Sequence, residues 1–326
     1  MKFGQWTIAA CAIIAAALPA QAQDAAANYP NRIVSLVSPY PAGGMNDVVS
    51  RIVGERLAAA WKATVVVDNK AGANGNIGAA YVARSPADGY TLLMANGATH
   101  GANPALYTNL GYDAVKDFKG VSNVTSSPIV LIVNPKSPFK TVRDLVEYAK
   151  ANPGKVTFGS SGVGSTGHLA GESFNKAAGI SAVHVPYRGD SPAITDVMSD
   201  TITMSFITYG SVLSQLEGGA VRALAKATNE KSSILPDVPS FISLNYKDFV
   251  FATWFSVVTP AGTPDPIVNK LSSGIQEALR QKPVIDRLLV LGAEPQPSSP
   301  AEADKFIRDQ IDRTGRMVKE LGIAIN

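Results

Sequence analysis

The sequence predicts an α/β fold of two similar lobes, and three observations lead to this prediction. Apolar strand-like runs alternate with helical patterns along most of the chain, which is typical of mostly parallel sheets flanked by helices. A glycine-rich turn at 38–47 follows an apolar run and precedes a helix start, and a second such turn stands at 159–168. Because glycine turns at helix N-termini bind anions, two such turns indicate two lobes that hold one acidic ligand.

The strands are expected where short runs of β-branched and aromatic residues lie between turn residues. These runs are 33–37, 65–67, 90–94, 129–133, 156–158, 182–185, 203–207 and 221–226.

The helices are expected from apolar spacing and from their end signals. Thr141 is a candidate N-cap, Pro192 stands in the first turn of a helix that begins at Asp190, and Ser299-Pro300-Ala301-Glu302 is a capping box. The expected helices cover 48–57, 77–83, 141–152, 166–178, 190 onward, 264–281 and 299 onward.

The first 22 residues have the pattern of a secretory signal. Met1-Lys2 gives a basic start, 8–18 is an apolar run too short to span a bilayer, and Ala20-Gln21-Ala22 is a small-x-small cleavage site. We therefore expect cleavage after Ala22 and export to a bacterial periplasm. The alternatives are a buried N-terminal helix and lipid attachment at Cys11. The apolar run before Cys11 is too short for a lipid-attachment signal.

Composition excludes several classes of function. Cys11 is the single cysteine, so the mature chain has neither disulfides nor a thiolate nucleophile. The three histidines, His100, His168 and His184, are not spaced like metal ligands, so no metal is expected. The net charge of +3 comes from interspersed charges, which argues against nucleic-acid and membrane surfaces.

The turn at 159–168 supports four interpretations, one of which is a purely structural turn with no ligand. Gly162 to Gly167 matches G-x-G-x-x-G and Asp190 follows the next strand, as in a dinucleotide site, although free nicotinamide cofactors are not expected outside the cytoplasm. Ser161 and His168 suggest a serine hydrolase, but neither Ser160 nor Ser161 has glycine two positions away on both sides. The serines and threonines of this turn best suit a small carboxylate that accepts many hydrogen bonds.

Charged residues near the turns have structural interpretations. Asp47 is expected as a first-turn acid that pairs with Arg51 at i+4. His168 is expected to bond within its own lobe rather than to ligand, and Arg188 is the one nearby candidate cation. The charge of a ligand would therefore be met mainly by neutral donors.

These segments, taken in order, resemble the Bug-type, tripartite tricarboxylate transporter receptor family of periplasmic solute-binding proteins. The resemblance covers essentially the whole mature chain and rests on many short motifs whose joint presence is specific. They include Pro39-Tyr40-Pro41-Ala42-Gly43-Gly44, Val67-Asp68-Asn69-Lys70-Ala71-Gly72, Ala87-Asp88-Gly89-Tyr90, the second turn through His168, Val185-Pro186-Tyr187-Arg188-Gly189, Leu235-Pro236-Asp237-Val238-Pro239 and Pro260-Ala261-Gly262-Thr263-Pro264.

The resemblance implies a type II-like, two-lobed periplasmic binding protein, each lobe a mostly parallel sheet flanked by helices, with the ligand in the interlobe cleft. It implies a hinged monomeric receptor that uses no cofactor, carries out no catalysis and delivers a small carboxylate to inner-membrane transporter subunits. The expected lobes are 24–127 plus 255–326, and 128–254. The implied ligand contacts are Tyr40, Ala42, Gly43, Gly44, Asp47, Thr99, Ser160, Ser161, Gly164, Ser165, Thr166, His168, Tyr187, Arg188, Gly189 and Thr208.

The sequence departs from the family pattern at one place. Many members carry an Asp-Asn-like pair after the strand at 203–206, where this chain has Ile207 and Thr208. Loss of that acid favours a plain carboxylate over an amino acid, and Ile207 suggests a ligand with an apolar or aromatic body.

Overall fold

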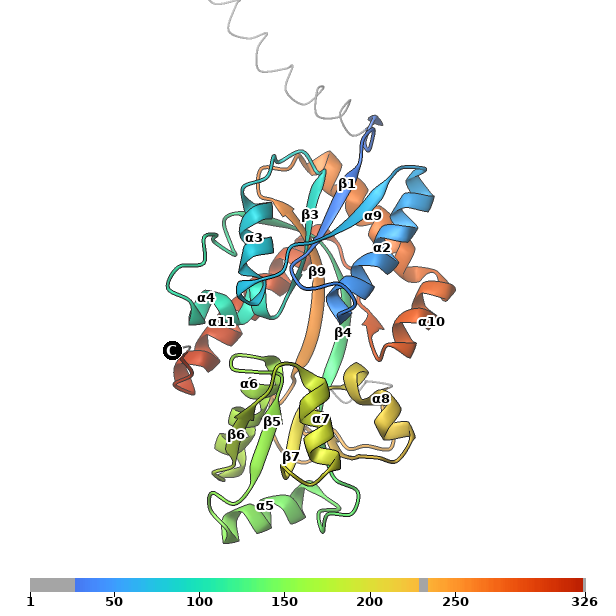
Figure 1. The fold of residues 1–326 in the computed structure, drawn as a ribbon. Coiled ribbons are helices and arrows are strands. Elements are labelled where there is room, and N and C mark those ends of the chain that lie inside the picture. The colour runs from blue at the N-terminus through green and yellow to red at the C-terminus, as the bar shows by residue number, and fades with distance from the viewer. Residues whose placement is uncertain (1–26, 229–233, 325–326) are drawn as a thin grey trace, which may run out of the picture.

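The computed structural model describes residues 27–228 and 234–324, and it has two lobes stacked one above the other (Figure 1). The predicted signal segment lies outside the described residues. The two-lobed α/β fold expected from the sequence is confirmed. One continuous sheet order, β2-β1-β3-β9-β4-β7-β5-β6, runs through both lobes, with β10 and β8 attached to β4.

The upper lobe in Figure 1 is built on three parallel strands, β2, β1 and β3, followed by antiparallel β9 and β4. Its strands are β1 (Val34–Ser38), β2 (Val65–Asn69), β3 (Thr91–Asn96), β9 (Ala252–Pro260), β10 (Glu294–Pro295) and the first part of β4 (Phe118–Val133). Its helices are α2 (Met45–Trp61), η1 (Ala73–Gly75), α3 (Asn76–Ala83), η2 (Ala98–Ala102), α4 (Asn103–Leu106), α9 (Asp265–Arg280), α10 (Lys282–Val290) and α11 (Pro300–Glu320).

The lower lobe repeats the plan with parallel β6, β5 and β7 beside the antiparallel second part of β4. Its other strands are β5 (Thr157–Ser160), β6 (Val183–Pro186), β7 (Met204–Thr208) and β8 (Arg222–Lys226). Its helices are α5 (Val142–Ala151), α6 (Thr166–Ala178), α7 (Asp190–Met198) and α8 (Tyr209–Glu217).

Helix capping follows the sequence signals where side-chain caps exist. Thr141 begins α5 and Ser299 begins α11, each within a complete capping box. Each lobe then buries its own apolar clusters. One joins Leu36 and Ile52 to Ile275 in the upper lobe, and another joins Phe158, Phe174 and Leu131 in the lower lobe.

The chain passes between the lobes in β4 and again at the start of β9, but only β4 pairs with strands of both lobes. The sixteen-residue β4 pairs with β9 up to Pro128 and with β7 from Ile129 onward, so its partner changes at one step of the chain. The alternation of strands and helices in the sequence does not reveal this change of partner. The element before β9 in the chain belongs to the lower lobe, so the order of elements does not show that β9 pairs in the upper lobe.

The last helix makes a third connection, which the sequence does not indicate. Ala303 and Ile307 near the start of α11 are buried with the upper lobe, whereas Val318 near its end belongs to the apolar core of the lower lobe. Lys176 of α6 pairs with Glu320 at 3.2 Å. In Figure 1, α11 runs from behind the upper lobe down toward α6. Within the described residues, every helix is too short or too polar to cross a bilayer.

Candidate functional site

A cavity of about 720 Å³ lies between the lobes, where the N-terminal ends of α2, α6, α7 and α8 converge. Helix N-termini present free N–H groups, so their convergence suits an anionic ligand. The lining residues are Tyr40, Gly44, Met45, Asn74, Asn96, Gly97, Ala98, Tyr107, Ile129, Ser161, Val163, Gly164, Ser165, Thr166, Gly167, Gly189, Asp190, Ser191, Phe206, Thr208, Ser211 and Thr253.

The first glycine turn is held by Asp47. The N–H of Gly43 donates to Asp47 Oδ2 at 2.9 Å, Arg51 Nε donates to the same oxygen at 3.0 Å, and Asn69 Nδ2 donates to Oδ1 at 2.9 Å. Burial of Asp47 would raise its pKa, but the bonds from Arg51, Gly43 and Asn69 outweigh it and lower the pKa. Gly44, the N-cap of α2, has no side chain to cap the first N–H groups of the helix, and Gly44 and Met45 line the cavity.

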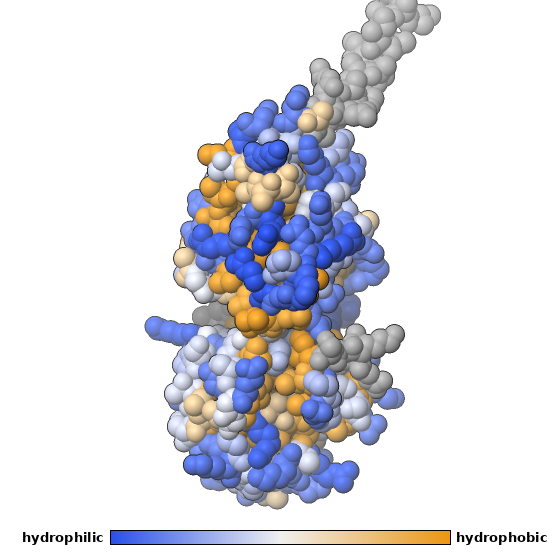
Figure 2. All heavy atoms as spheres, turned by 90° about the vertical axis from the view of Figure 1, so that its right-hand side faces the viewer, coloured by the Kyte–Doolittle hydropathy of each residue, from blue (hydrophilic) through white to orange (hydrophobic). Residues whose placement is uncertain are grey.

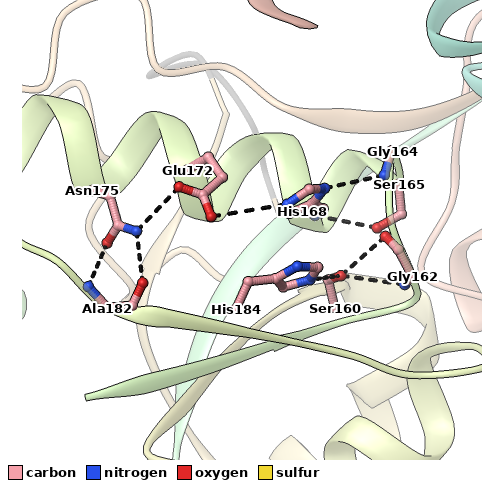
Figure 3. Close-up of polar contacts among 9 residues, drawn as sticks. All are labelled: Ser160, Gly162, Gly164, Ser165, His168, Glu172, Asn175, Ala182 and His184. Carbon is pink, nitrogen blue, oxygen red and sulfur yellow. Dashed lines mark hydrogen bonds and ion pairs between the residues drawn. The ribbon is translucent and has the colours of Figure 1, made fainter. Parts of the chain in front are cut away.

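The second glycine turn is held by a histidine (Figure 3). The N–H of Gly164 donates to His168 Nδ1 at 3.1 Å, and the N–H of His168 donates to Ser165 Oγ at 3.2 Å. Ser160 accepts from the N–H of Gly162 at 3.2 Å. Much of the donor capacity of this turn is therefore used inside the turn.

The two turns share one bracing geometry. In each, the side chain at the third helical position accepts a hydrogen bond from the N–H of the glycine just before the N-cap: Asp47 from Gly43, and His168 from Gly164. Both glycines have positive φ, 86° and 77°. The acceptor is a carboxylate in one lobe and an imidazole in the other.

A stack of two imidazoles supports the second turn from below. The His168 and His184 rings are 3.8 Å apart and nearly parallel, and His184 Nε2 lies 2.7 Å from Ser160 Oγ (Figure 3). Burial lowers the pKa of each histidine to about 4. Both rings are neutral at neutral pH, which leaves Nδ1 of His168 free to accept.

Asp190 is the acid of the cavity. It is the first residue of α7 and follows Gly189. Burial raises its pKa more than interactions with the hydroxyls of Ser211, Ser161 and Thr208 lower it. Among the described residues that line the cavity, it is the one acidic side chain, and none is lysine, arginine or histidine.

Half of the residues implied by the resemblance line the cavity. They are Tyr40, Gly44, Ser161, Gly164, Ser165, Thr166, Gly189 and Thr208.

The other half lie outside the lining, for identifiable reasons. Ala42, Gly43 and Arg188 are exposed. Asp47 and His168 face inward to brace their turns, as their structural interpretation expected. Ser160 is fully buried against His184, Thr99 is bonded to Asn96, and the hydroxyl of Tyr187 donates to Asp196 at 2.5 Å.

The expectation that Ile207 faces the ligand is wrong. Its side chain is fully buried in the apolar cluster of Ile132 and Val212, behind β7. The cavity nevertheless contains an acid, Asp190, which belongs to a different element.

Several lining residues were not expected from the sequence: Asn74, Asn96, Tyr107, Asp190, Ser211 and Thr253. Asp190 had a signal, because it follows a strand and begins a helix. Tyr40 adds a neutral hydroxyl, since burial raises its pKa to about 12.

Apart from the contacts of α11, the lobes meet at the cavity and at a second place away from it. At the cavity, a Cβ on Gly164 would lie 2.5 Å from Leu106 Cδ1 of α4, and one on Gly97 would lie 3.7 Å from Thr166 Oγ1. Away from the cavity, Gly210 of the lower lobe and Gly292 of the upper lobe pack backbone to backbone, and the N–H of Gly210 donates to Ser127 Oγ at 3.3 Å. The second contact leaves no room for a side chain at either glycine.

The side of the molecule that carries α8 and α10 shows hydrophobic surface where the lobes meet (Figure 2). A second hollow, of about 620 Å³, lies between these helices and the loop at 234–238, lined in part by Leu213, Leu216 and Leu289. It contains neither glycine turn, so we assign the ligand site to the larger cavity.

Two α/β lobes joined by crossing strands, with helix N-termini converging on the cavity between them, define the chain as a two-lobed solute-binding protein. Comparison of the chain with known protein families and solved structures agrees with this class. The model of the tripartite tricarboxylate transporter family receptor, TctC, matches residues 49–323. The chain belongs to this family, whose members are periplasmic receptors.

Individual relatives support the assignment. The chain is 35% identical to protein BugT of Bordetella pertussis over 91% of each chain. It is similar to the solved structure of R. palustris Rpa4515 with adipate, with 33% identity, a TM-score of 0.81 and coverage of 91% of this chain and 100% of that one. It is also similar to MatC from Rhodopseudomonas palustris with bound malate, with 28% identity, a TM-score of 0.76 and coverage of 89% and 100%.

Proposed function

We propose that this protein is a periplasmic receptor that captures a small carboxylate for uptake through a tripartite tricarboxylate-type transporter. The observation that carries the proposal is the convergence of helix N-termini from both lobes on one cavity that, among the described residues, has no cationic lining. The carboxylates held by Rpa4515 and MatC, adipate and malate, support the ligand class.

Neutral donors are sufficient for useful affinity. Each hydrogen bond to a charged group contributes about 1.5–3 kcal/mol, so four or five such bonds, less the ordering costs, reach about −8 kcal/mol, which is micromolar binding. The uncapped start of α2, the hydroxyls of Ser165 and Thr166 and the side chains of Asn74 and Asn96 supply donors of this kind.

The receptor acts by closing two lobes on the ligand. The proposed division is 24–127 plus 255–326 against 128–254, with β4 and β9 as crossing strands. The proposal further includes export with cleavage after Ala22, action as a monomer and delivery to inner-membrane transporter subunits. A ligand that contacts both lobes stabilises the closed form by its difference in affinity for the two forms.

A thermal-shift screen of mono-, di- and tricarboxylates and aromatic acids tests the ligand class, and calorimetry measures affinity for the best acid. Small-angle scattering is expected to give a smaller radius of gyration with that acid. No stabilisation by any acid contradicts the carboxylate assignment. An unchanged radius with binding confirmed contradicts closure.

An exported α/β enzyme is the competing function, and one observation favours its dinucleotide form. Asp190 follows β6 and shares the cavity with the Gly162–Gly167 turn, which is the relation that the dinucleotide pattern requires. Membership of a receptor family supports binding without catalysis. Mass spectrometry of the best acid after incubation decides the matter: unchanged acid is expected, whereas turnover or a nicotinamide cofactor retained on purification contradicts the receptor.

Arg188 provides a separate test of neutral recognition. Its side chain is exposed and lies outside the cavity lining. Arg188→Ala is therefore expected to leave the Kd of the best acid within about twofold. Loss of binding in this variant alone would show that an arginine clamp, and not the helix N-termini, meets the charge of the ligand.

A further inference from the structure

The charge pattern of the cavity is uneven. The starts of α2 and α6 bring backbone donors to one part of the lining through Gly44, Met45, Thr166 and Gly167. At the start of α7, Asp190 instead adds a negatively charged side chain to the lining. An anionic group fits the first part, while a second anionic group beside Asp190 would meet a like charge with no cation in the described lining to offset it.

The hydroxyls around Asp190 extend the acceptor character of its part of the cavity. Ser161, Thr208 and Ser211 all line the cavity and act on the Asp190 carboxyl group as hydrogen-bond donors. A hydroxyl has one proton, so a hydroxyl that donates to Asp190 turns only lone pairs toward the cavity. Thr208 Oγ1 also lies 3.0 Å from Thr253 Oγ1, which continues the hydroxyl chain onto β9.

These hydroxyls do not fully compensate the acid. Burial raises the pKa of Asp190 despite the hydroxyl interactions and despite its place at the start of α7, where the helix dipole favours a negative charge. The ionised carboxylate is thus less well solvated in the cavity than in water. A donor supplied by the ligand would restore what burial removes.

We propose that Asp190 is the specificity-determining residue of this site, and that it selects carboxylates that also carry a hydrogen-bond-donating group, either an ammonium or a hydroxyl. The carboxylate of the ligand lies toward the helix starts of α2 and α6, and the donor group contacts Asp190. This inference rests on the proposed function. It reverses the preference for a plain carboxylate that the loss of an acid at position 207 suggested.

The test uses acids that differ at one substituent. Propionate, lactate and alanine share a carbon skeleton and carry hydrogen, hydroxyl or ammonium, and butyrate, 2-hydroxybutyrate and 2-aminobutyrate form a longer set. Calorimetry on the mature protein at about pH 7 gives a Kd for each, with all ligand carboxyl groups ionised. We expect a hydroxyl- or ammonium-bearing acid to bind at least roughly tenfold more tightly than its plain parent, because its donor adds a hydrogen bond to the charged carboxylate of Asp190.

Asp190→Asn tests the residue itself. It is expected to reduce the preference for the donor-bearing acid to about threefold or less, whereas Asp190→Glu, which keeps the charge, retains part of it. Asp196→Asn is the matched control, since Asp196 lies on the same helix, bonds Tyr187 and does not line the cavity. Thermal unfolding of each variant verifies that it is folded.

Two results overturn the inference. One is a preference that is absent or does not depend on Asp190: the wild-type protein binds the plain acids as tightly as their substituted forms, or the Asp190→Asn variant keeps the preference. The other is an absence of binding by all six acids. In either case the proposed function is decided separately by the wider carboxylate screen, so the two failures are distinguishable.

Discussion

The two glycine turns have the same backbone design but different chemistry. In the upper lobe, Asp47 braces Gly43 with a buried negative charge that also pairs with Arg51. In the lower lobe, His168 braces Gly164 with a neutral ring nitrogen. The upper helix has a glycine N-cap with no side-chain bond, and the lower helix is capped by Ser165.

The difference indicates a division of work between the lobes. The upper turn fixes its loop with a charge and leaves the helix start open to the cavity. The lower turn uses several of its hydrogen-bond donors within the turn and presents hydroxyl groups to the cavity instead. Two turns with similar sequences therefore need not contribute equally to binding the charge of the ligand.

Removing the Asp47 carboxylate is expected to give the largest effect. Asp47→Ala leaves the N–H of Gly43, the amide of Asn69 and Arg51 without their shared acceptor, so the free energy of unfolding is expected to fall by about 3 kcal/mol. Urea unfolding measures the change. Asp286→Ala, which breaks an exposed pair with Lys282, is the control and should cost about 0.5 kcal/mol or less. Equal losses in the two variants would mean that Asp47 does not brace the turn.

Adding a side chain at Gly43 or at Gly164 is expected to affect the two turns differently. Both positions have positive φ, so Gly43→Val and Gly164→Val each cost about 1–3 kcal/mol of stability. Gly43 has open space around it, whereas a side chain at 164 meets Leu106 of the other lobe. We expect only Gly164→Val to weaken binding of the best acid, by about tenfold or more, because the lobes cannot close.

The double variant Gly164→Val/Leu106→Ala provides the control for this contact. Removing the Leu106 side chain makes room for the valine, so part of the lost affinity is expected to return. Additive losses would place the effect of position 164 in its own loop and not between the lobes.

Acid is expected to weaken the lower turn selectively. His168 has a pKa of about 4 in the folded protein against an ordinary 6.5, so the unfolded chain binds more protons between these values. The contribution of neutral His168 to the free energy of unfolding is complete above pH 6.5. It is lost as the pH falls toward 4, by up to about 3 kcal/mol. His168→Asn keeps an acceptor that does not titrate, and its melting temperature should fall less over this range. An unchanged slope would assign the acid sensitivity to His184 or to buried His100.

The cap of α6 gives the smallest expected effect. Ser165→Ala removes the acceptor for the N–H of His168 and should cost about 1 kcal/mol of stability. If the hydroxyl only caps the helix, the Kd of the best acid stays within about twofold of the wild type. A larger loss of affinity than of stability would identify Ser165 as a ligand contact.

The sequence predicts those parts of the molecule that depend on local signals. Capping boxes at Thr141 and Ser299 and the glycine turns before α2 and α6 are all found where expected. The partner change within β4 depends on residues that are 71 to 142 positions further along the chain, so no local pattern encodes it.

The site was only half predictable for a similar reason. Strand β7 is buried on both faces, so alternation does not show that Ile207 turns away from the cavity. Asp190 reads locally as a helix-start acid, and only the tertiary structure places it beside Ser161, Thr208 and Ser211. Asp47 and His168 illustrate the converse, because their local interpretation as residues that serve their own lobe agrees with the geometry.

The path of α11 has a mechanical consequence. A helix anchored by Ile307 in the upper lobe and by Val318 in the lower lobe acts as a strut beside the two crossing strands. Any change of the angle between the lobes must bend this strut or detach its last turns, together with the Lys176–Glu320 pair. We therefore expect the C-terminal residues, far in sequence from both glycine turns, to influence how readily the cleft opens.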